Sequence, residues 1–267
     1  MSPIIVRVFS SLSRGRDGLY NVQGHRIYLS DGDTHSPIGM VLDNYEPETT
    51  NLLKNLVKPG MVVIDVGAHV GYYTLLAARQ TGNLGKVYSF EPAPSNYALL
   101  AKNIETTGYE NIEARQAAVS SSAGSLDFHL VTQFSGTHSL HHRGFHAGGV
   151  ITVDVVSIDG FLEEIGWPKI DVIKVDAEGS ELDVLTGMRQ LLDHQKNLEM
   201  IIEFFPSELR NAGKEPSALI CFLDQSGFVV QHISDDDGLV PFKQDEMQET
   251  IEHLITYGDS INLYCKR

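Results

Sequence analysis

The sequence predicts an α/β fold: a doubly wound, mostly parallel sheet with a small N-terminal β extension. Three observations predict it. Short runs rich in β-branched residues alternate with helix-like stretches along most of the chain. The run 61–66 leads into a turn with Gly67 and Gly71 and then into a helical stretch. A second run, from Lys86, ends in Glu91 about twenty residues after that turn, which is typical of the first two βα units of a nucleotide-binding sheet.

Composition limits the class of protein. The chain has 267 residues and 42% hydrophobic content, enough for the core of one large domain. A net charge of −15 argues against non-specific binding to nucleic acid or to anionic membranes, and no apolar run is long enough to span a bilayer. Cys221 and Cys265 form no C-x-x-C pair, so we expect reduced core thiols, with a single disulfide as the alternative. We therefore expect a cytoplasmic protein, and the sequence gives no indication of oligomeric state.

The N-terminal part differs from the rest. Residues 1–18 are basic and contain serines without an amphipathic helix, which favours an arm of a cytosolic protein over a transit peptide. Residues 19–45 alternate weakly around Asp31-Gly32-Asp33, which predicts a β-hairpin that could cover the mouth of a site. We expect residues 1–45 to form an arm and hairpin extension and residues 46–267 to form the main domain.

The remaining elements follow from apolar periodicity, caps and glycines. The expected strands are 61–66, 86–91, 112–119, an outlying 124–131, 151–156, 170–175, 198–204, 228–233 and 260–266. The expected helices are 51–57, 72–79, 95–108 with Ser95 as its N-cap, 157–164, one from the turn at Gly179 to about 192, and 217–226. The acidic stretch 235–252 is expected to be a solvated loop.

The glycine turn limits the classes of ligand that the site is expected to bind. Dinucleotide-binding proteins carry G-x-G-x-x-G after the strand, whereas only Gly67 and Gly71 are present here, with Asp65 at the strand end. A carboxylate repels phosphate and suits a cation. S-adenosylmethionine has a sulfonium and an ammonium group and no phosphate, so it fits better than a dinucleotide, while an ordinary βα turn is the alternative. Gly67, which lacks a Cβ, is expected to let the ligand approach the backbone.

Three further residues fit such a ligand. Glu91 can accept hydrogen bonds from both ribose hydroxyls, the alternative being a solvated charge at a strand end. Ala118, at the end of the run 112–119, is small enough to let an adenine ring lie against the backbone. Glu48 either meets the ammonium group or complements a helix dipole.

Carboxylates also gather at the expected ligand edge of the sheet. Asp176 ends the run 170–175, and Glu178 follows two residues later, before Gly179. Helix capping is the alternative explanation, but a pair of carboxylates at this edge favours a function in the site. Glu203 interrupts another apolar run, so it is either paired or faces the site.

A histidine-rich stretch over residues 133–149 is too long for a simple connection. With His129, it brings together five of the eleven histidines, the others being His138, His141, His142 and His146. No H-E-x-x-H spacing and no cysteine accompany them, which favours a polar lid over a metal site. His138 is a candidate for a base that faces the substrate.

Four motifs resemble the FkbM-type S-adenosylmethionine-dependent methyltransferases. They are Val63-Ile-Asp-Val-Gly-Ala-His-Val-Gly-Tyr-Tyr-Thr, Phe90-Glu-Pro, Ser157-Ile-Asp and Ile173-Lys-Val-Asp-Ala-Glu-Gly-Ser-Glu, in order between about Tyr45 and Pro206. The resemblance implies a Rossmann-like class I methyltransferase sheet of seven strands with the last antiparallel. It also implies methyl transfer to a hydroxyl of a small-molecule acceptor such as a sugar, glycoside or polyketide. His69 stands where the family usually has Asn, and segment 1–40 is not covered.

With that resemblance, the expected cofactor is S-adenosylmethionine. Its expected binding residues are Glu48, Asp65, Gly67, Ala68, His69, Gly71, Tyr72, Glu91, Pro92, Ala118 and Asp176. Because the sulfonium already activates the methyl group, the protein must align the acceptor hydroxyl and remove its proton. Asp176, Glu178 and His138 are the candidate bases, in that order.

Other chemistries stay open. A divalent metal held by Asp176, Glu178 and Glu203 would acidify the hydroxyl instead of a protein base, although no metal is required. A nicotinamide-dependent oxidoreductase would share the sheet but needs the missing glycine fingerprint. A non-catalytic cofactor-binding or scaffold protein would not need the carboxylates at 176 and 178.

Overall fold

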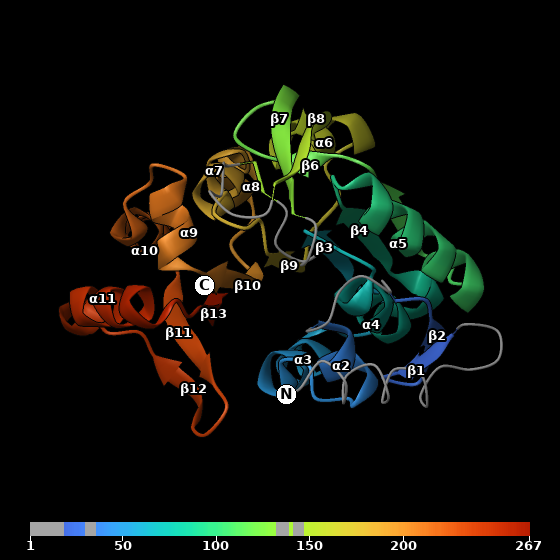
Figure 1. The fold of residues 1–267 in the computed structure, drawn as a ribbon, viewed down its shortest axis with the longest axis horizontal. Coiled ribbons are helices and arrows are strands. Elements are labelled where there is room, and N and C mark those ends of the chain that lie inside the picture. The colour runs from blue at the N-terminus through green and yellow to red at the C-terminus, as the bar shows by residue number, and fades with distance from the viewer. Residues whose placement is uncertain (1–18, 30–35, 132–138, 141–146) are drawn as a thin grey trace.

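A computed structural model describes residues 19–29, 36–131, 139–140 and 147–267. Its central sheet has eight strands in the order β12-β11-β13-β10-β9-β3-β4-β5 (Figure 1). The strands are β3 (Val62–Val66), β4 (Lys86–Phe90), β5 (Ile112–Arg115), β9 (Val172–Val175), β10 (Glu199–Phe204), β11 (Val229–Ser234), β12 (Gly238–Pro241) and β13 (Ile261–Lys266). β13 is antiparallel to both of its neighbours, whereas β5, β4, β3, β9 and β10 are parallel. This confirms the predicted seven-stranded sheet, to which β12 adds an eighth strand as a hairpin with β11.

Helices cover both faces of the sheet. They are α2 (Ser36–Val41), α3 (Pro47–Leu56), α4 (Tyr72–Thr81), α5 (Pro94–Thr107), α6 (Ile158–Ile165), α7 (Glu181–Thr186), α8 (Arg189–His194), α9 (Pro206–Asn211), α10 (Pro216–Gln225) and α11 (Met247–Tyr257). Two separate hydrophobic clusters result. One joins the sheet to α6–α11, and the other joins it to α3, α4 and the N-terminal hairpin. Central strands such as β3 and β9 are buried on both sides because both faces are covered.

Several expected helix boundaries were wrong. Ser95 is not an N-cap: α5 begins one residue earlier, at Pro94, after Ala93. The single helix expected to run to about 192 is two helices, α7 and α8. A Cβ on Gly187 between them would lie 2.2 Å from the Ser120 carbonyl oxygen, so the chain passes another segment closely at the break. The expected helix 157–164 is confirmed as α6, and the Ser157 hydroxyl caps it by accepting from the Gly160 N–H at 3.1 Å.

The strand expected over 112–119 divides into two. Its first half is β5, and its second half is β6 (Ala118–Val119), which leaves the central sheet and pairs with β8 (Ala147–Val156). β7 (Gly124–Val131), expected as an outlying strand, is confirmed and pairs antiparallel with β8. These three strands form a small sheet beside the carboxyl ends of β4 and β5 (Figure 1).

The N-terminal hairpin is shorter than expected. β1 (Tyr20–Val22) and β2 (His25–Ile27) join through Gln23 and Gly24, both with positive φ. The expected turn at 31–33 lies outside the described residues, and the apolar run 38–42 belongs mainly to α2, so its assignment to a strand was wrong. The division at residue 45 remains a prediction, since the hairpin shares a hydrophobic cluster with α4.

The acidic stretch 235–252 was wrongly predicted to be a loop. It contains β12, a short 3-10 helix η3 (Gln244–Glu246) and the start of α11. Ile251 and Leu254 are buried on the inner side of α11, whereas Glu249 and Glu252 are exposed, as in an amphipathic helix.

The remaining predictions concern the cysteines, membrane-spanning helices and the N-terminal arm. Cys221 and Cys265 are both free, as predicted, but Cys221 is exposed and only Cys265 is a core thiol. Within the described residues no helix is long and apolar enough to cross a membrane. The basic arm 1–18 lies outside the described residues.

Candidate active site

A pocket lies at the carboxyl ends of the adjacent strands β4, β3 and β9, where doubly wound sheets bind their ligands. It is lined by Tyr45, Val66, Gly67, His69, Phe90, Glu91, Pro92, Asn96, Ala117, Ala118, Val119, Phe128, Leu140, Asp176, Ala177, Glu178 and Ser180. Seven of the residues predicted for cofactor binding or catalysis are therefore brought together: Gly67, His69, Glu91, Pro92, Ala118, Asp176 and Glu178.

Glu91 lies at the end of β4 and is 5% exposed. One carboxylate oxygen accepts from the His69 N–H at 2.8 Å, and the other accepts from the Ala93 N–H at 2.9 Å. The Asn96 amide adds a longer contact of 3.4 Å. Burial raises the pKa of Glu91 to about 7, although these hydrogen bonds oppose the shift. The side chain is therefore held in place before any ligand arrives.

The structure indicates a role for Gly67 that was not predicted from the sequence. Gly67 has a φ of 79°, and a Cβ there would lie 1.8 Å from the Asp176 carbonyl oxygen. Its missing side chain thus makes room for β9, which is a requirement of the fold as well as of any ligand. Gly71 has a φ of 98° at the start of α4, where a Cβ would lie 2.8 Å from a Leu100 methyl carbon.

Apolar side chains line the end of the pocket beside the small sheet. Ala117 and Ala118 lie there with Phe90, as predicted for Ala118. Phe128 from β7 and Leu140 also line this end, and sequence reasoning missed both because the small sheet itself was not predicted. The result is an apolar wall beside Glu91.

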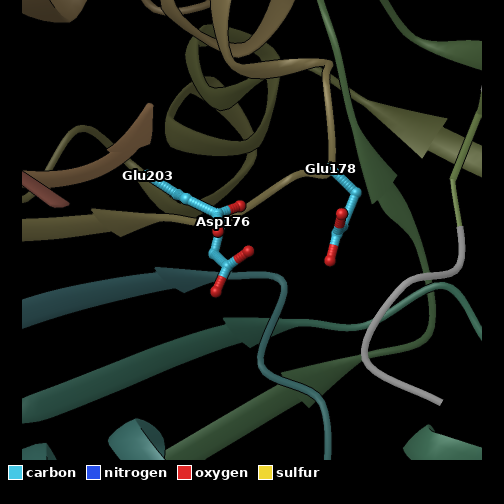
Figure 2. Close-up of side chains that lie close together, drawn as sticks. All are labelled: Asp176, Glu178 and Glu203. Atoms are coloured by element: carbon cyan, nitrogen blue, oxygen red, sulfur yellow. The ribbon is translucent and has the colours of Figure 1, made fainter. Parts of the chain in front are cut away.

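An acidic group lies at the carboxyl ends of β9 and β10. Asp176 follows β9, Glu178 lies on the turn after it, and Glu203 lies on the neighbouring β10 (Figure 2). One oxygen of each carboxylate lies within 4.8 Å of the others. One Glu203 oxygen accepts from the Ser260 hydroxyl at 2.9 Å, while the other is buried without a hydrogen-bond partner. Burial, followed by repulsion from Asp176 and Glu178, raises the pKa of Glu203 well above its usual range.

Lys174 supplies a positive charge beneath this group, and sequence reasoning missed it. It is 3% exposed, its ammonium lies 2.8 Å from Asp176 Oδ2 and 4.7 Å from the centre of the Tyr73 ring. Burial would lower the pKa of Lys174, but the carboxylates of Asp176, Asp65 and Glu46 raise it above its usual range. The signal was a lysine inside an otherwise apolar buried strand, which requires a partner.

The turn between Asp176 and α7 is held by local hydrogen bonds. Glu178 adopts a φ of 50° and Gly179 one of 97°. The buried Glu181 carboxylate accepts from the N–H groups of Ala177 and Gly179, at 3.0 and 3.1 Å. The Ser139 hydroxyl donates to the Glu178 carbonyl at 2.7 Å. Glu178 thus lies on a turn fixed from two sides.

The other predicted site residues lie near the pocket without lining it. Asp65 is buried beneath the turn, where it accepts from the Thr74 hydroxyl at 2.6 Å, and burial raises its pKa. Ala68, Gly71 and Tyr72 are also absent from the lining, as is Glu48 in the first turn of α3. Neither strand of the N-terminal hairpin contributes a lining residue. His138, with most of the histidine-rich stretch, lies outside the described residues.

Glu46, rather than Glu48, is the acidic residue of α3 that is connected to this region. Its carboxylate accepts from the Tyr73 hydroxyl and from the Asn262 amide, each at 2.8 Å. Tyr45, directly before it, lines the pocket and was not predicted. No pattern in the sequence indicated this, because the contacts join α3 to residues far along the chain.

Comparisons with known proteins agree with this geometry. The methyltransferase FkbM domain matches residues 65–230. The hexuronic acid methyltransferase AglP of Haloferax volcanii is 30% identical over 55% of this chain and 58% of its own. The 31-O-demethyl-FK506 methyltransferase FkbM of Streptomyces tacrolimicus is 30% identical over 49% of this chain and 61% of its own. The match thus covers about three fifths of each of these relatives.

A third relative is matched over more of its length. The 2-O-methyltransferase NoeI of Sinorhizobium fredii is 26% identical over 66% of this chain and 76% of its own. Among solved structures, a precorrin-6y C5,15-methyltransferase from Geobacter metallireducens aligns over 84% of this chain with a TM-score of 0.48 and 10% identity. That structural similarity is too low to carry a conclusion.

Proposed function

Because the chain belongs to the FkbM methyltransferase family, we propose that it transfers a methyl group from S-adenosylmethionine to a hydroxyl of a small-molecule acceptor. The acceptor class is a sugar, glycoside or polyketide-type metabolite. Relatives named for 2-O-methylation and for 31-O-demethyl-FK506 support oxygen as the methylated atom, and one named for a hexuronic acid supports a sugar as the acceptor. A cytoplasmic location and the absence of nucleic-acid partners remain predictions from composition.

One observation carries the proposal: a single pocket joins Glu91 at the end of β4 to Asp176 at the end of β9. Glu91 presents oxygens that can accept from ribose hydroxyls, and the acidic group at the other end suits a ligand with positive charges. A nicotinamide cofactor would instead bring its pyrophosphate toward the carboxylates.

We expect the cofactor to lie across the carboxyl ends of the strands, with adenine, ribose and the amino acid portion following one another as they are covalently joined. Adenine fits the apolar wall at Ala118 and Phe128, and the ribose fits at Glu91. Given the strand order β4-β3-β9, the sulfonium and the amino acid portion would then lie over Gly67 and Asp176. This order leaves the acidic end of the pocket for the reacting methyl group and the acceptor.

The reaction needs alignment and removal of a proton. The acceptor oxygen attacks the methyl carbon in line, from about 3–3.5 Å. The C–S bond breaks, the sulfur keeps the bonding electron pair as a thioether, and the hydroxyl proton passes to a base. We assign the base to Asp176, with Glu178 second and His138 third. Lys174 holds the Asp176 carboxylate from the side of the sheet.

A metal-assisted route is the second candidate. Asp176, Glu178 and Glu203 present oxygens, the ligands that Mg²⁺ and Mn²⁺ prefer, and one buried Glu203 oxygen has no hydrogen-bond partner. A divalent cation bound there would acidify the acceptor hydroxyl. The three carboxylates would then hold the cation and orient the acceptor.

The test is a screen of neutral sugars, hexuronic acids and hydroxylated polyketides with the purified protein and S-adenosylmethionine. Release of S-adenosylhomocysteine, together with an acceptor mass gain of one methylene unit, is the expected result. Saturable NAD binding with no binding of either sulfur compound would overturn the proposal. Cofactor binding without transfer to any acceptor class would favour a non-catalytic role. Activity that chelator abolishes and Mg²⁺ or Mn²⁺ restores would favour the metal-assisted route.

A further inference from the structure

Tyr45 is a pocket residue to which neither the sequence motifs nor the proposed reaction assigns a role. It precedes α3 and lines the pocket together with Gly67 and Asp176. Its ring packs against Tyr72 and Tyr73, with centroid distances of 5.1 and 6.3 Å. Because Tyr72 and Tyr73 begin α4 directly after the glycine turn, Tyr45 is fixed at the end of β3.

The surroundings of Tyr45 place it at the acidic end of the pocket. Burial raises the pKa of its phenol well above the usual value, and the carboxylates of Glu46, Asp176 and Glu203 raise it further. The phenol therefore stays neutral, and the ring keeps the negative face of an uncharged aromatic system. The ring is half-buried, so water screens its attraction to a cation only in part.

The order of the strand ends indicates which part of the cofactor would contact the Tyr45 ring. With adenine beside Ala118 and the ribose at Glu91, the next part of the cofactor is the sulfonium, above β3 and β9. Tyr45 lines the same pocket as Gly67 and Asp176, which follow these two strands. We propose that the Tyr45 ring binds the positively charged sulfonium by a cation–π interaction, so that the pocket prefers S-adenosylmethionine over its uncharged thioether product. The inference rests on the proposed function.

The proposed contact between the Tyr45 ring and the sulfur would weaken during the reaction. Methyl transfer removes the positive charge from the sulfur, so the ring attracts the product less than the substrate. The neighbouring carboxylates also lose their attraction for the sulfur at that moment. Tyr45 differs from them because its contribution depends on the electron density of the ring, which can be changed without changing any formal charge.

The experiment is calorimetric titration of S-adenosylmethionine and S-adenosylhomocysteine into the unmutated protein, Tyr45→Phe and Tyr45→Leu. Tyr45→Leu is expected to weaken S-adenosylmethionine binding about three- to thirtyfold, the range of a cation–π contact from partly exposed to desolvated. S-adenosylhomocysteine binding should change by less than that. Tyr45→Phe keeps the ring and should keep the preference.

Tyr109→Leu is the matched control. Tyr109 is also a half-buried tyrosine with an edge-to-face ring contact, to His25 at 5.7 Å, but it does not line the pocket. It should leave both dissociation constants unchanged. If Tyr45→Leu does not fold, progressively fluorinated phenylalanines at position 45 replace it, since they keep the ring shape and weaken its negative face. The affinity for S-adenosylmethionine should then fall stepwise with fluorine number.

The outcomes separate this inference from the proposed function. Binding of neither sulfur compound to the unmutated protein overturns both. Binding of both compounds, weakened equally by Tyr45→Leu or unaffected by fluorination, overturns only the role of the ring. A loss of preference in Tyr45→Phe as large as that in Tyr45→Leu assigns the effect to the hydroxyl and overturns the cation–π contact.

Discussion

The carboxylates at the ends of β4 and β9 are held in opposite ways. At the β4 end, both oxygens of Glu91 accept backbone N–H groups. At the β9 end, Asp176, Glu178 and Glu203 crowd within 4.8 Å, and a buried Glu203 oxygen has no partner. The first arrangement is complete without a ligand. The second is completed only by a proton or a cation.

This difference separates binding from chemistry. A carboxylate held by backbone donors is a fixed acceptor, suited to hydroxyl groups that stay unchanged. A crowded group of carboxylates is costly to keep charged, and that cost is what favours a cationic ligand or the uptake of a proton. Changes at the two ends should therefore affect different measurements.

The largest expected effect is on turnover, at the acidic end. Asp176→Asn removes the proposed base and preserves side-chain shape, so we expect turnover to fall about 10²–10⁴-fold with cofactor binding retained. Steady-state kinetics with the best acceptor from the screen, paired with calorimetry, measures both quantities. His138→Ala is the comparison: a larger loss there, with Asp176→Asn and Glu178→Gln near normal, would move the base to the histidine-rich stretch.

A large effect on stability is expected from Lys174→Met, which leaves Asp176 and Asp65 without their buried counter-charge. Leaving a buried charge such as Asp65 uncompensated typically costs about 3–5 kcal/mol, so the free energy of unfolding in urea should fall by that order. Lys214→Met is the matched control, because Lys214 pairs with Asp183 where both side chains are about a quarter exposed. It should cost at most about 1 kcal/mol. Equal losses in the two variants would show that Lys174 is an ordinary ion-pair partner.

A smaller effect is expected at the β4 end. Glu91→Ala should weaken the binding of S-adenosylhomocysteine by about 1.5–3 kcal/mol, the contribution of hydrogen bonds to a charged group. Calorimetry measures it, and circular dichroism checks that the fold persists. Unchanged affinity would mean that the ribose does not lie at Glu91.

The smallest effect is a dependence of cofactor affinity on pH. The pKa of Glu91 is raised from 4.5 to about 7 by burial, so its carboxyl is protonated below that pH and presents fewer acceptor oxygens. Affinity for S-adenosylhomocysteine should therefore rise with pH up to about 7 and then level off, by at most about tenfold per pH unit. Glu91→Gln should remove the dependence. The same raised pKa means that the stability of the unliganded protein decreases between pH 4.5 and about 7.

Much of the fold could be predicted because the central strands are apolar runs bounded by glycines and charges. Glu91 and Asp176 were predictable for a related reason: each ends such a run, and ends of parallel strands meet at one edge. α11 was missed because its first half was assigned to the acidic stretch 235–252, although Ile251 and Leu254 have helical spacing. Tyr45 and Glu46 were missed because their contacts to α4 and β13 depend on tertiary packing, which local periodicity does not contain.

The contact between Gly67 and Asp176 also limits how this protein can evolve. β3 and β9 are joined here by the Asp176 N–H to Val66 bond of 3.0 Å, and the Gly67 N–H bonds to Phe90 on the other side at 2.9 Å. Every other amino acid would bring a Cβ into the Asp176 carbonyl. Position 67 therefore has no acceptable single substitution. The proposed base, Asp176, contributes the carbonyl that lies against this glycine. A substitution at position 67 would therefore displace the catalytic carboxylate together with the cofactor turn. Changes of acceptor must then come from the surrounding loops, while this junction stays fixed.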